Sequence, residues 1–466
     1  MKNILFLMLL VSFLFSANTL FSDDTEIGGF LKSDYRFLVD KDKEDVPFND
    51  TFSNLHIKLH KDVSDNIAIE ASGETRVYGM TGVSTPADMS DPNKQYVVDP
   101  MLWEMYVDFY DLGIEGIDLR IGKQIIAWGK ADRINPTANL NSDDFSDIFN
   151  FGEQIPTFAT KLNYELNEEF AIELIWLPTM KPALMPRDAS IQMGGELKSV
   201  LAPYQEKLGS LPAGMVVTNP TVRVNTPEYD LRHSMQAVKI KGTLFEIDYS
   251  LSYLHGYDDI PTPEKVNISL TTDGNTVNTE IDMNFFEYNV LGMDFAGELA
   301  GMGWWIESAL FLPVDGVNVA VTAPDFTTGQ SNTQHTEIFD DSPYVKATIG
   351  IDYTFSWSMY INLQYAHGLP MERGKEENIN DYIFARIEQK FNHDKLKLIM
   401  NLAGGITNKD DIENNYGYLV NPELKWFPYD STELTLGGDI IGGKGNNFFT
   451  SLESYEMLYI QAKVNF

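Results

Sequence analysis

The chain ends in the stretch Tyr-Ile-Gln-Ala-Lys-Val-Asn-Phe, residues 459–466, in which residue types alternate with a period of two. The apolar positions are Ile460, Ala462, Val464 and Phe466, and the positions between them are polar or amphipathic. Successive side chains of a β-strand point to opposite faces, so the stretch predicts a half-buried strand. This strand stops on an aromatic residue at the last position.

Alternation of the same kind recurs along the whole chain. The clearest segment, residues 344–355, carries apolar residues at alternate positions: Val345, Ala347, Ile349, Ile351, Tyr353 and Phe355. Counting all such segments gives about 18, each close to the ~10 residues that a tilted membrane-spanning strand needs. The terminal stretch is therefore predicted to be the last strand of a large β-structure.

The connections between these segments alternate between short and long. The short ones are residues 61–65, 111–116, 165–168, 242–243, 298–301, 356–357, 392–394 and 428–431. The long ones are residues 40–50, 80–98, 123–155, 178–232, 255–283, 313–342, 369–379, 406–415 and 442–453. Short periplasmic turns and long extracellular loops are typical of outer-membrane barrels, whereas a soluble sandwich has no reason to sort its loops. The predicted fold is an all-β transmembrane antiparallel barrel of about 18 strands, with 16 as the alternative.

A terminal strand that ends in Phe466 resembles the signal by which outer-membrane barrels are recognised for insertion. The resemblance implies barrel-assembly machinery and outer-membrane lipid as partners. The start of the chain agrees: Lys2 is the only charge before Asp23, and an apolar run over residues 4–15 precedes small residues. This order is typical of a secretory signal peptide, and the run is short for a membrane-spanning helix, although a membrane anchor is the alternative. We predict a signal peptide over residues 1–22.

The composition supports a membrane barrel over residues 23–466. No later stretch approaches 18 apolar residues, so no transmembrane helix is expected. The formal net charge of −34 makes nucleic acid an improbable partner, and the absence of cysteine excludes disulfides. Several aromatic residues adjoin short turns or the C-terminus, where they predict an interfacial belt: Trp304, Phe355, Trp357, Trp426, Phe427, Tyr429 and Phe466.

The polar faces of the predicted strands should line a water-filled lumen, because unpaired charge in a dry interior is prohibitively costly. Barrels of 16–18 strands leave an aqueous channel. Candidate lumen-lining residues of both signs are Arg36, Lys58, Glu74, Arg76, Glu104, Asp108, Lys346, Asp352, Arg386 and Glu388. The negative excess therefore belongs mainly to the loops, where it either concentrates cations at the mouth or is merely solvated.

The third long loop, residues 123–155, follows the most distinctive local sequence. Residues 119–129 read Leu-Arg-Ile-Gly-Lys-Gln-Ile-Ile-Ala-Trp-Gly. Alternation places Leu119 and Ile121 toward lipid and Arg120 and Gln124 inward. Lys123 is out of inward phase, so either a bulge intervenes or the residue lies at the membrane interface. Two glycines, at positions 122 and 129, would permit a bulge or a close backbone approach, and a proline at position 136 ends any regular ladder.

This stretch resembles a family of bacterial outer-membrane proteins of unassigned function, related to alginate-export and other substrate-specific porins. Their shared string is met here by Arg120, Gly122, Gln124, Trp128, Gly129, Asn135 and Pro136, with Lys123 where Arg is usual. The resemblance implies a passive channel whose third loop dips into the lumen. The implied constriction residues are Arg120, Lys123, Gln124, Lys130, Asp132, Arg133, Asp143, Asp144 and Asp147. The alternative is a loop that only braces the wall.

Catalytic and metal-binding patterns are weak. A barrel-rim hydrolase of the protease or phospholipase type needs a nucleophile and a base, or paired carboxylates, at one rim. Ser234 directly follows His233, but neighbours on a strand point to opposite faces. The pair His56 and His60 shares one strand face, where ordinary polar lumen groups account for it. We expect no enzyme activity, no catalytic residues, no metal and no cofactor.

The fourth loop carries apolar residues spaced as on one face of a helix over residues 197–208. Such a helix either constricts the bore or packs on neighbouring loops. Taken together, the sequence predicts a porin-like channel of the bacterial outer membrane for passive or facilitated passage of small solutes. The alternatives are a barrel-rim hydrolase and a surface adhesin that uses the long loops.

Overall fold

The structure, a computed structural model, describes residues 25–39, 51–79, 82–83, 85–147, 149–150, 152–185, 216–218, 220–271, 276–324 and 330–466. The signal peptide predicted for residues 1–22 lies outside the described residues, as does the helix predicted within residues 197–208. In the described part, no helix is long and apolar enough to cross a membrane.

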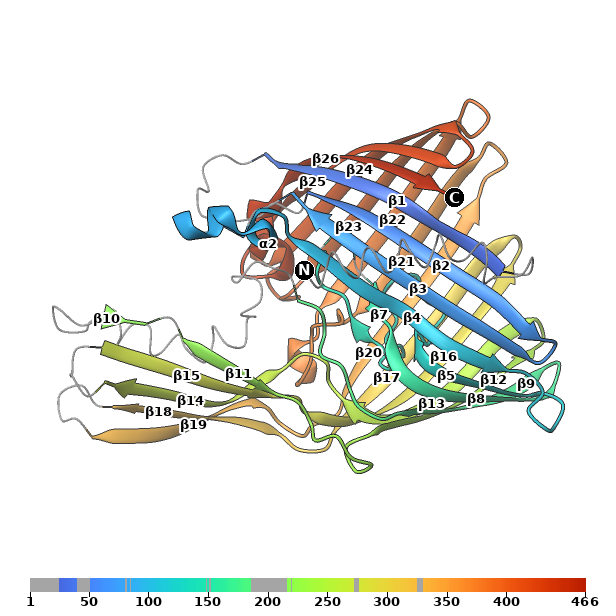
Figure 1. Cartoon of the computed structure of the whole chain (residues 1–466). Coiled ribbons are helices and arrows are strands. Elements are labelled where there is room, and N and C mark those ends of the chain that lie inside the picture. The colour runs from blue at the N-terminus through green and yellow to red at the C-terminus, as the bar shows by residue number, and fades with distance from the viewer. Residues whose placement is uncertain are drawn as a thin grey trace.

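Eighteen antiparallel strands form one closed sheet (Figure 1). They are β1 (Thr25–Leu38), β2 (Phe52–Ser64), β3 (Ile67–Tyr78), β4 (Val98–Phe109), β5 (Ile117–Gln124), β8 (Thr157–Asn167), β9 (Phe170–Leu177), β12 (Met235–Leu244), β13 (Ile247–Tyr257), β16 (Glu287–Leu299), β17 (Met302–Pro313), β20 (Tyr344–Thr354), β21 (Met359–His367), β22 (Asp381–Phe391), β23 (Leu396–Ile406), β24 (Tyr416–Tyr429), β25 (Thr432–Lys444) and β26 (Met457–Asn465). The C-terminal strand closes the barrel by pairing with β1, from Phe30 opposite Asn465 to Leu38 opposite Met457. The predicted fold and strand number are confirmed.

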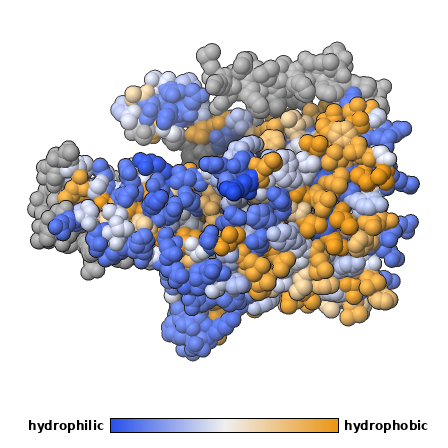
Figure 2. Space-filling view, turned by 90° about the horizontal axis from the view of Figure 1, so that it is seen from below, coloured by the Kyte–Doolittle hydropathy of each residue, from blue (hydrophilic) through white to orange (hydrophobic). Residues whose placement is uncertain are grey.

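The wall separates apolar and polar side chains as the alternation predicts. On β20, Ile349 and Ile351 are exposed on the outer face, whereas Lys346 and Thr348 are buried on the inner face. Apolar side chains gather over the barrel part of the molecule in Figure 2, on the side away from the projecting sheet. The exterior thus suits lipid and the interior suits water.

One predicted turn is wrong. The alternation pattern predicts residues 242–243 as a short connection between two strands. Instead β12 continues to Leu244, and the turn is made by Phe245 and Glu246, which have φ of 53° and 64°. Two-residue hairpins favour positive φ at both turn positions. Gly242 lies within β12. Glycine is needed at this strand position because a Cβ there would come 2.5 Å from the Glu169 carbonyl oxygen.

A second sheet projects from the long-loop end of the barrel (Figure 1). It contains β10 (Val216–Val217), β11 (Thr221–Asn225), β14 (Thr262–Leu270), β15 (Thr276–Asn284), β18 (Val317–Pro324) and β19 (Ser331–Phe339). Its buried side chains include Val266, Val277 and Val319. These strands lie in segments that the sequence assigned to long loops. Several of them pair in parallel with strands from other loops, which alternation along one segment cannot reveal.

Short elements complete the described chain. Within the third loop, β6 (Ser142–Asp143) pairs with β7 (Gln154–Ile155). The single-turn helices are η1 (Pro86–Ser90), α2 (Pro92–Gln95), η2 (Glu376–Asn378), η3 (Ile412–Asn414), α5 (Phe448–Ser451) and η4 (Glu453–Tyr455). At the short-turn end, Phe355 stacks on Trp357 with ring centroids 4.5 Å apart, and Trp357, Trp426 and Tyr429 are exposed, as side chains of an interfacial belt must be.

Candidate functional site

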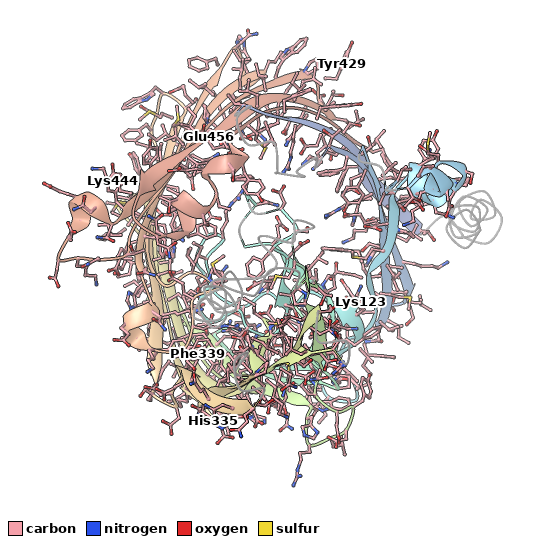
Figure 3. All side chains as sticks on the ribbon, turned by 90° about the vertical axis from the view of Figure 1, so that its left-hand side faces the viewer. Lys123, His335, Phe339, Tyr429, Lys444 and Glu456 are labelled. Carbon is pink, nitrogen blue, oxygen red and sulfur yellow. The ribbon has the colours of Figure 1, made fainter. Side chains whose placement is uncertain are left out.

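The third loop crosses the bore and bonds to the inner faces of distant strands. The backbone N–H of Lys130 donates to Glu307 on β17 at 2.8 Å, and the N–H of Asp132 donates to Gln364 on β21 at 3.2 Å. The Thr348 hydroxyl on β20 donates to the carbonyl of Ile134 at 3.1 Å. Figure 3 looks into the barrel from the long-loop end, along the bore that this segment enters.

Glu307 is the main attachment point of the loop. Its carboxylate is fully buried and accepts four hydrogen bonds, from the N–H groups of Lys130, Ala131 and Thr137 and from the Thr137 hydroxyl, at 2.8–3.1 Å. The backbone approaches so closely because Gly129 has no side chain: a Cβ there would lie 2.7 Å from Glu307 Oε2. Gly129 also has a φ of +87°, which L-residues rarely adopt. We call this arrangement the Glu307 clamp.

Trp128 holds the residues just before Gly129 against β9, on the same side of the bore as Glu307. Its indole N–H donates to Glu173 on β9 at 3.1 Å, and the Lys239 ammonium lies 5.4 Å from the ring centroid. Lys241 pairs with the same glutamate at 2.6 Å. Buried indole N–H groups need such a partner. The Trp-Gly pair of the sequence motif is therefore a docking element of the loop.

The base of the loop is closed by amide side chains. Gln124 is buried and donates to the Ala159 carbonyl at 3.1 Å. Asn141 accepts from the Ile126 N–H at 2.7 Å and donates to the carbonyls of Gln124 and Ile155 at 3.1 Å each. These bonds tie the start of the loop at Ile126 to backbone carbonyls of β5, β7 and β8.

One side of the bore is filled by an apolar cluster. Ile126, Trp128 and Leu140 of the loop pack with inward side chains of the wall from β9 to β20, including Ile175, Leu254, Val290, Phe311 and Tyr344. The loop is therefore held to this side by burial as well as by the Glu307 clamp. A second apolar cluster also holds Ile134 of the loop to the other side of the bore, against Ala366, Tyr382 and Ile441.

That other side contains a cavity of about 390 Å³ between the loop and the wall formed by β21–β26 and β1. Its wall carries an apolar row, in which Phe384, Ala403 and Leu419 are opposite one another on adjacent strands. A polar row runs beside it: Arg386 donates to Asn401 at 3.0 Å, and Asn401 donates to Asn421 at 2.8 Å. The facing loop side carries Asp132, Arg133, Phe149 and Asn150.

A second cavity of about 270 Å³ adjoins the first, and both are lined by Lys32, Asp147 and Asn150. Asp147 is held there by two bonds from the Arg36 guanidinium, at 3.1 and 2.5 Å. Burial alone would raise the pKa of Asp147, but the ion pair with Arg36 holds that pKa below its ordinary value. This carboxylate thus stays charged beside both cavities.

A carboxyl pair joins the third loop to the loop after β13. The Asp143 N–H donates to Asp259 at 2.6 Å, beside a cavity of about 310 Å³. Burial raises the pKa of Asp143 to about 7; Asp258 adds to the rise and Lys346 opposes it. Burial and then Asp143 also raise the pKa of Asp259. Arg373 closes the junction by donating to Asp258 and to the Ile260 carbonyl.

The junction should loosen as pH rises. A carboxyl whose pKa is raised by folding contributes stability that is complete below pH ~4 and is lost as pH rises through about 7. We expect amide hydrogen exchange around residues 143 and 259, corrected for intrinsic rates, to be faster at pH 8 than at pH 5. Asp143→Asn should flatten this dependence, whereas the exposed Asp341→Asn should not. Equal protection from exchange at both pH values would show that folding does not raise the pKa of this carboxyl pair.

The predicted constriction residues divide into three groups. Lys130, Asp132, Arg133, Asp143, Asp144 and Asp147 lie on the loop segment that enters the bore. Arg120 instead pairs with Asp108 on the neighbouring strand at 2.6 Å, and Gln124 is buried under the loop. The placement of Lys123 in the constriction is wrong. It pairs across the strands with Met105 and Phe158, both exposed on the outer face, so its side chain starts outside the bore.

The lumen-lining candidates bond to other inward groups. The pairs are Lys58 with Glu70, Arg76 with Glu74, Asp352 with Tyr360, Arg386 with Glu388, Arg36 with Asp34, Lys346 with the Pro370 carbonyl, and Glu104 with the Ile125 N–H. Asp108 pairs with Arg120 as described. Reasoning from the sequence missed Glu307, and it did not predict the bond between Glu173 and Trp128. Glu307 alternates in step with Trp305 and Ala309, so its inward position could have been predicted from the sequence. Its bonds to residues 129–137 could not.

The candidate chemical sites have structural roles. The His233 ring bonds to Asp230 at 2.8 Å, and the Ser234 hydroxyl donates to the Leu231 carbonyl at 2.8 Å, so they do not form a nucleophile and base. Glu228, Asp230 and His233 have ligand atoms within 4.8 Å of one another, but they are largely exposed, and Asp230 already accepts bonds from two backbone N–H groups. His56 and His60 face separate carboxylates, Glu74 and Glu70.

Comparison with solved structures finds the same fold. Acinetobacter baumannii OccAB3 matches with a TM-score of 0.50 at 9% identity, over 96% of this chain and 100% of that chain. OccAB1 of the same organism matches with a TM-score of 0.50 at 10% identity, over 96% and 97%. At such identities the likeness shows the fold alone, that of outer-membrane porins.

Sequence comparison gives the family. A search of curated proteins found no match. One family model, described as "Protein of unknown function (DUF1302)", matches residues 49–383. Because this match covers most of the chain, including β3–β21 and the whole third loop, the chain belongs to the DUF1302 family.

Proposed function

We propose that the protein is a passive channel for small solutes in the bacterial outer membrane. One observation carries the proposal: the third loop enters the bore without filling it, and two adjoining cavities lined by charged and amide side chains remain between the loop and the wall of β21–β26 and β1–β4. Such side chains need water, because unpaired charge in a dry interior is costly. The porin fold supports the location and the barrel's contact with lipid, and the C-terminal strand supports recognition by assembly machinery.

The lining favours small organic solutes that have both apolar and polar parts. Binding sites for such molecules combine apolar surface with a few placed polar groups. Here the apolar row of Phe384 and Leu419 runs beside the polar row of Arg386 and Asn401, and Arg133 and Phe149 repeat the combination on the loop side. The relation to alginate-export porins stays a prediction.

Planar-bilayer recording of the purified barrel tests the proposal. We expect discrete conductance steps in salt and faster swelling of loaded liposomes in small organic solutes than in solutes too large for the cavities. A folded barrel that neither conducts nor admits any solute would refute the channel. If such a sealed barrel hydrolysed lipid or peptide, the rim-hydrolase alternative would replace it.

Ion selectivity should depend on Arg133. Its side chain is exposed and bonds to the neutral Asn150 at 3.3 Å, and in the described part of the chain it makes no ion pair. The acidic loops should give modest cation preference at low salt, where screening is weak. Arg133→Gln should strengthen this preference, measured as a larger reversal potential in a salt gradient.

Lys123→Gln removes the same charge from the end of β5, just before the third loop, but on the outer face. It should therefore leave the reversal potential unchanged and serves as the matched control. Equal shifts in both variants would mean that Arg133 does not face the conducting path.

A further inference from the structure

Lys123 presents a positive charge on the lipid-facing side of the wall. It follows the outward parity of Ile121 and lies between Met105 on β4 and Phe158 on β8, whose side chains are 48% and 43% exposed on that face. Its ammonium donates to the Leu102 carbonyl, at a bulge where β4 shifts register against β3. This bond satisfies a carbonyl but leaves the charge unneutralised.

A second lysine, Lys181 of the fourth loop, lies near the same part of the wall. The Lys181 ammonium lies 6.0 Å from the centroid of the Phe158 ring, and it interacts electrostatically with Lys123. Within the described residues, neither lysine has a carboxylate at ion-pair distance. Glu104 attracts Lys123, but one of its carboxylate oxygens accepts from the Ile125 N–H. Two like charges on one region of the wall, neither paired with a carboxylate in the described residues, favour an anionic partner.

The position of this pair identifies the kind of anion. Lys123 is the penultimate residue of β5 and Phe158 the second residue of β8, so both lie where these strands end at the long-loop side of the wall (Lys123 is labelled in Figure 3). Trp176, exposed on neighbouring β9, adds an aromatic side chain of the type that anchors barrels at a membrane interface. Charge on the lipid face is tolerated near an interface but not at the midplane.

We propose that Lys123 and Lys181 bind a phosphate group of an anionic glycolipid in the outer leaflet, with Phe158 and Met105 contacting its acyl chains. Ammonium groups donate charge-assisted hydrogen bonds to phosphate oxygens, and basic clusters at membrane interfaces recognise phosphorylated headgroups. The site rests on the proposed membrane location but not on conduction, since it lies outside the bore.

Native mass spectrometry of the full barrel in neutral detergent tests the site, with bisphosphorylated lipid A as the probe. We expect wild type to retain one lipid A more tightly than the fully dephosphorylated lipid. Lys181→Gln should weaken lipid A binding about fivefold and Lys123→Gln/Lys181→Gln about thirtyfold, if each lysine contributes the ~1 kcal/mol of an interfacial basic residue. Lys61→Gln, a change at the short-turn end of β2, is the matched control and should bind as wild type.

Lys181→Gln leaves the bulge bond of Lys123 intact, so it reports on the site even if the double variant folds poorly. Retention of bilayer conductance by the variants would show an intact channel and separate lipid binding from the proposed function. Wild-type affinity in the folded double variant, or binding that does not depend on phosphate, would overturn the proposal.

Discussion

Replacing Glu307 with glutamine should release the third loop and raise single-channel conductance. The clamp places two donors on each carboxylate oxygen. Glutamine keeps one oxygen and turns an NH₂ group toward the donors of the other. The Thr137 hydroxyl can accept from that NH₂, but a backbone N–H cannot, so at least one backbone donor loses its acceptor. Each unsatisfied buried group costs about 1–3 kcal/mol. Because every 1.4 kcal/mol is about tenfold in an equilibrium, the detached state should gain about fivefold or more in population.

Planar-bilayer recording is the measurement, and the expected signs are a larger mean conductance and greater open-channel noise. Glu298→Gln, a change at the exposed short-turn end of β16, removes the same charge without touching the loop and should conduct as wild type. If folded Glu307→Gln keeps wild-type conductance and noise, the clamp does not hold the loop, and the apolar cluster alone is sufficient.

The wall of this barrel could be predicted because its information is local. Period-two alternation within a segment predicts both that the segment is a strand and which of its side chains face lipid. The alternation of short turns and long loops predicts that consecutive strands pair. The alternation also predicted that Lys123 faces outward, whereas the family resemblance wrongly implied that it lies in the constriction. The projecting sheet could not be predicted in this way, because β14 pairs with β18 across an intervening barrel hairpin.

The candidate site was only partly predictable for the same reason. The motif marked Trp128 and Gly129, and the need for glycine at a close approach was visible in the sequence. Their partners Glu173 and Glu307 lie on other strands of the wall, and only the path of the loop through the bore brings them together. A polar residue at an inward position of the alternation predicts that its side chain faces the bore. It does not predict which group that side chain binds.

Gly129→Ala should reproduce the effect of Glu307→Gln by a different route. A Cβ at position 129 would meet both carboxylate oxygens of Glu307, at 2.7 and 2.8 Å, and Asn135 Oδ1 at 2.7 Å. The alanine must also hold a φ of +87°, which costs about 1–2 kcal/mol for an L-residue. The loop should therefore leave its seat, and conductance and noise should rise as in Glu307→Gln.

Gly113→Ala separates the two causes, because Gly113 has a φ of +72° but no atom within 4 Å of its added Cβ. It imposes a similar backbone cost at a short turn and should leave conductance unchanged. In a double-mutant cycle, Gly129→Ala and Glu307→Gln should be strongly non-additive, since either change alone empties the same contact. Additive effects of the two substitutions would mean that they act on different structures, and the clamp would then not be the single element that sets the width of the passage.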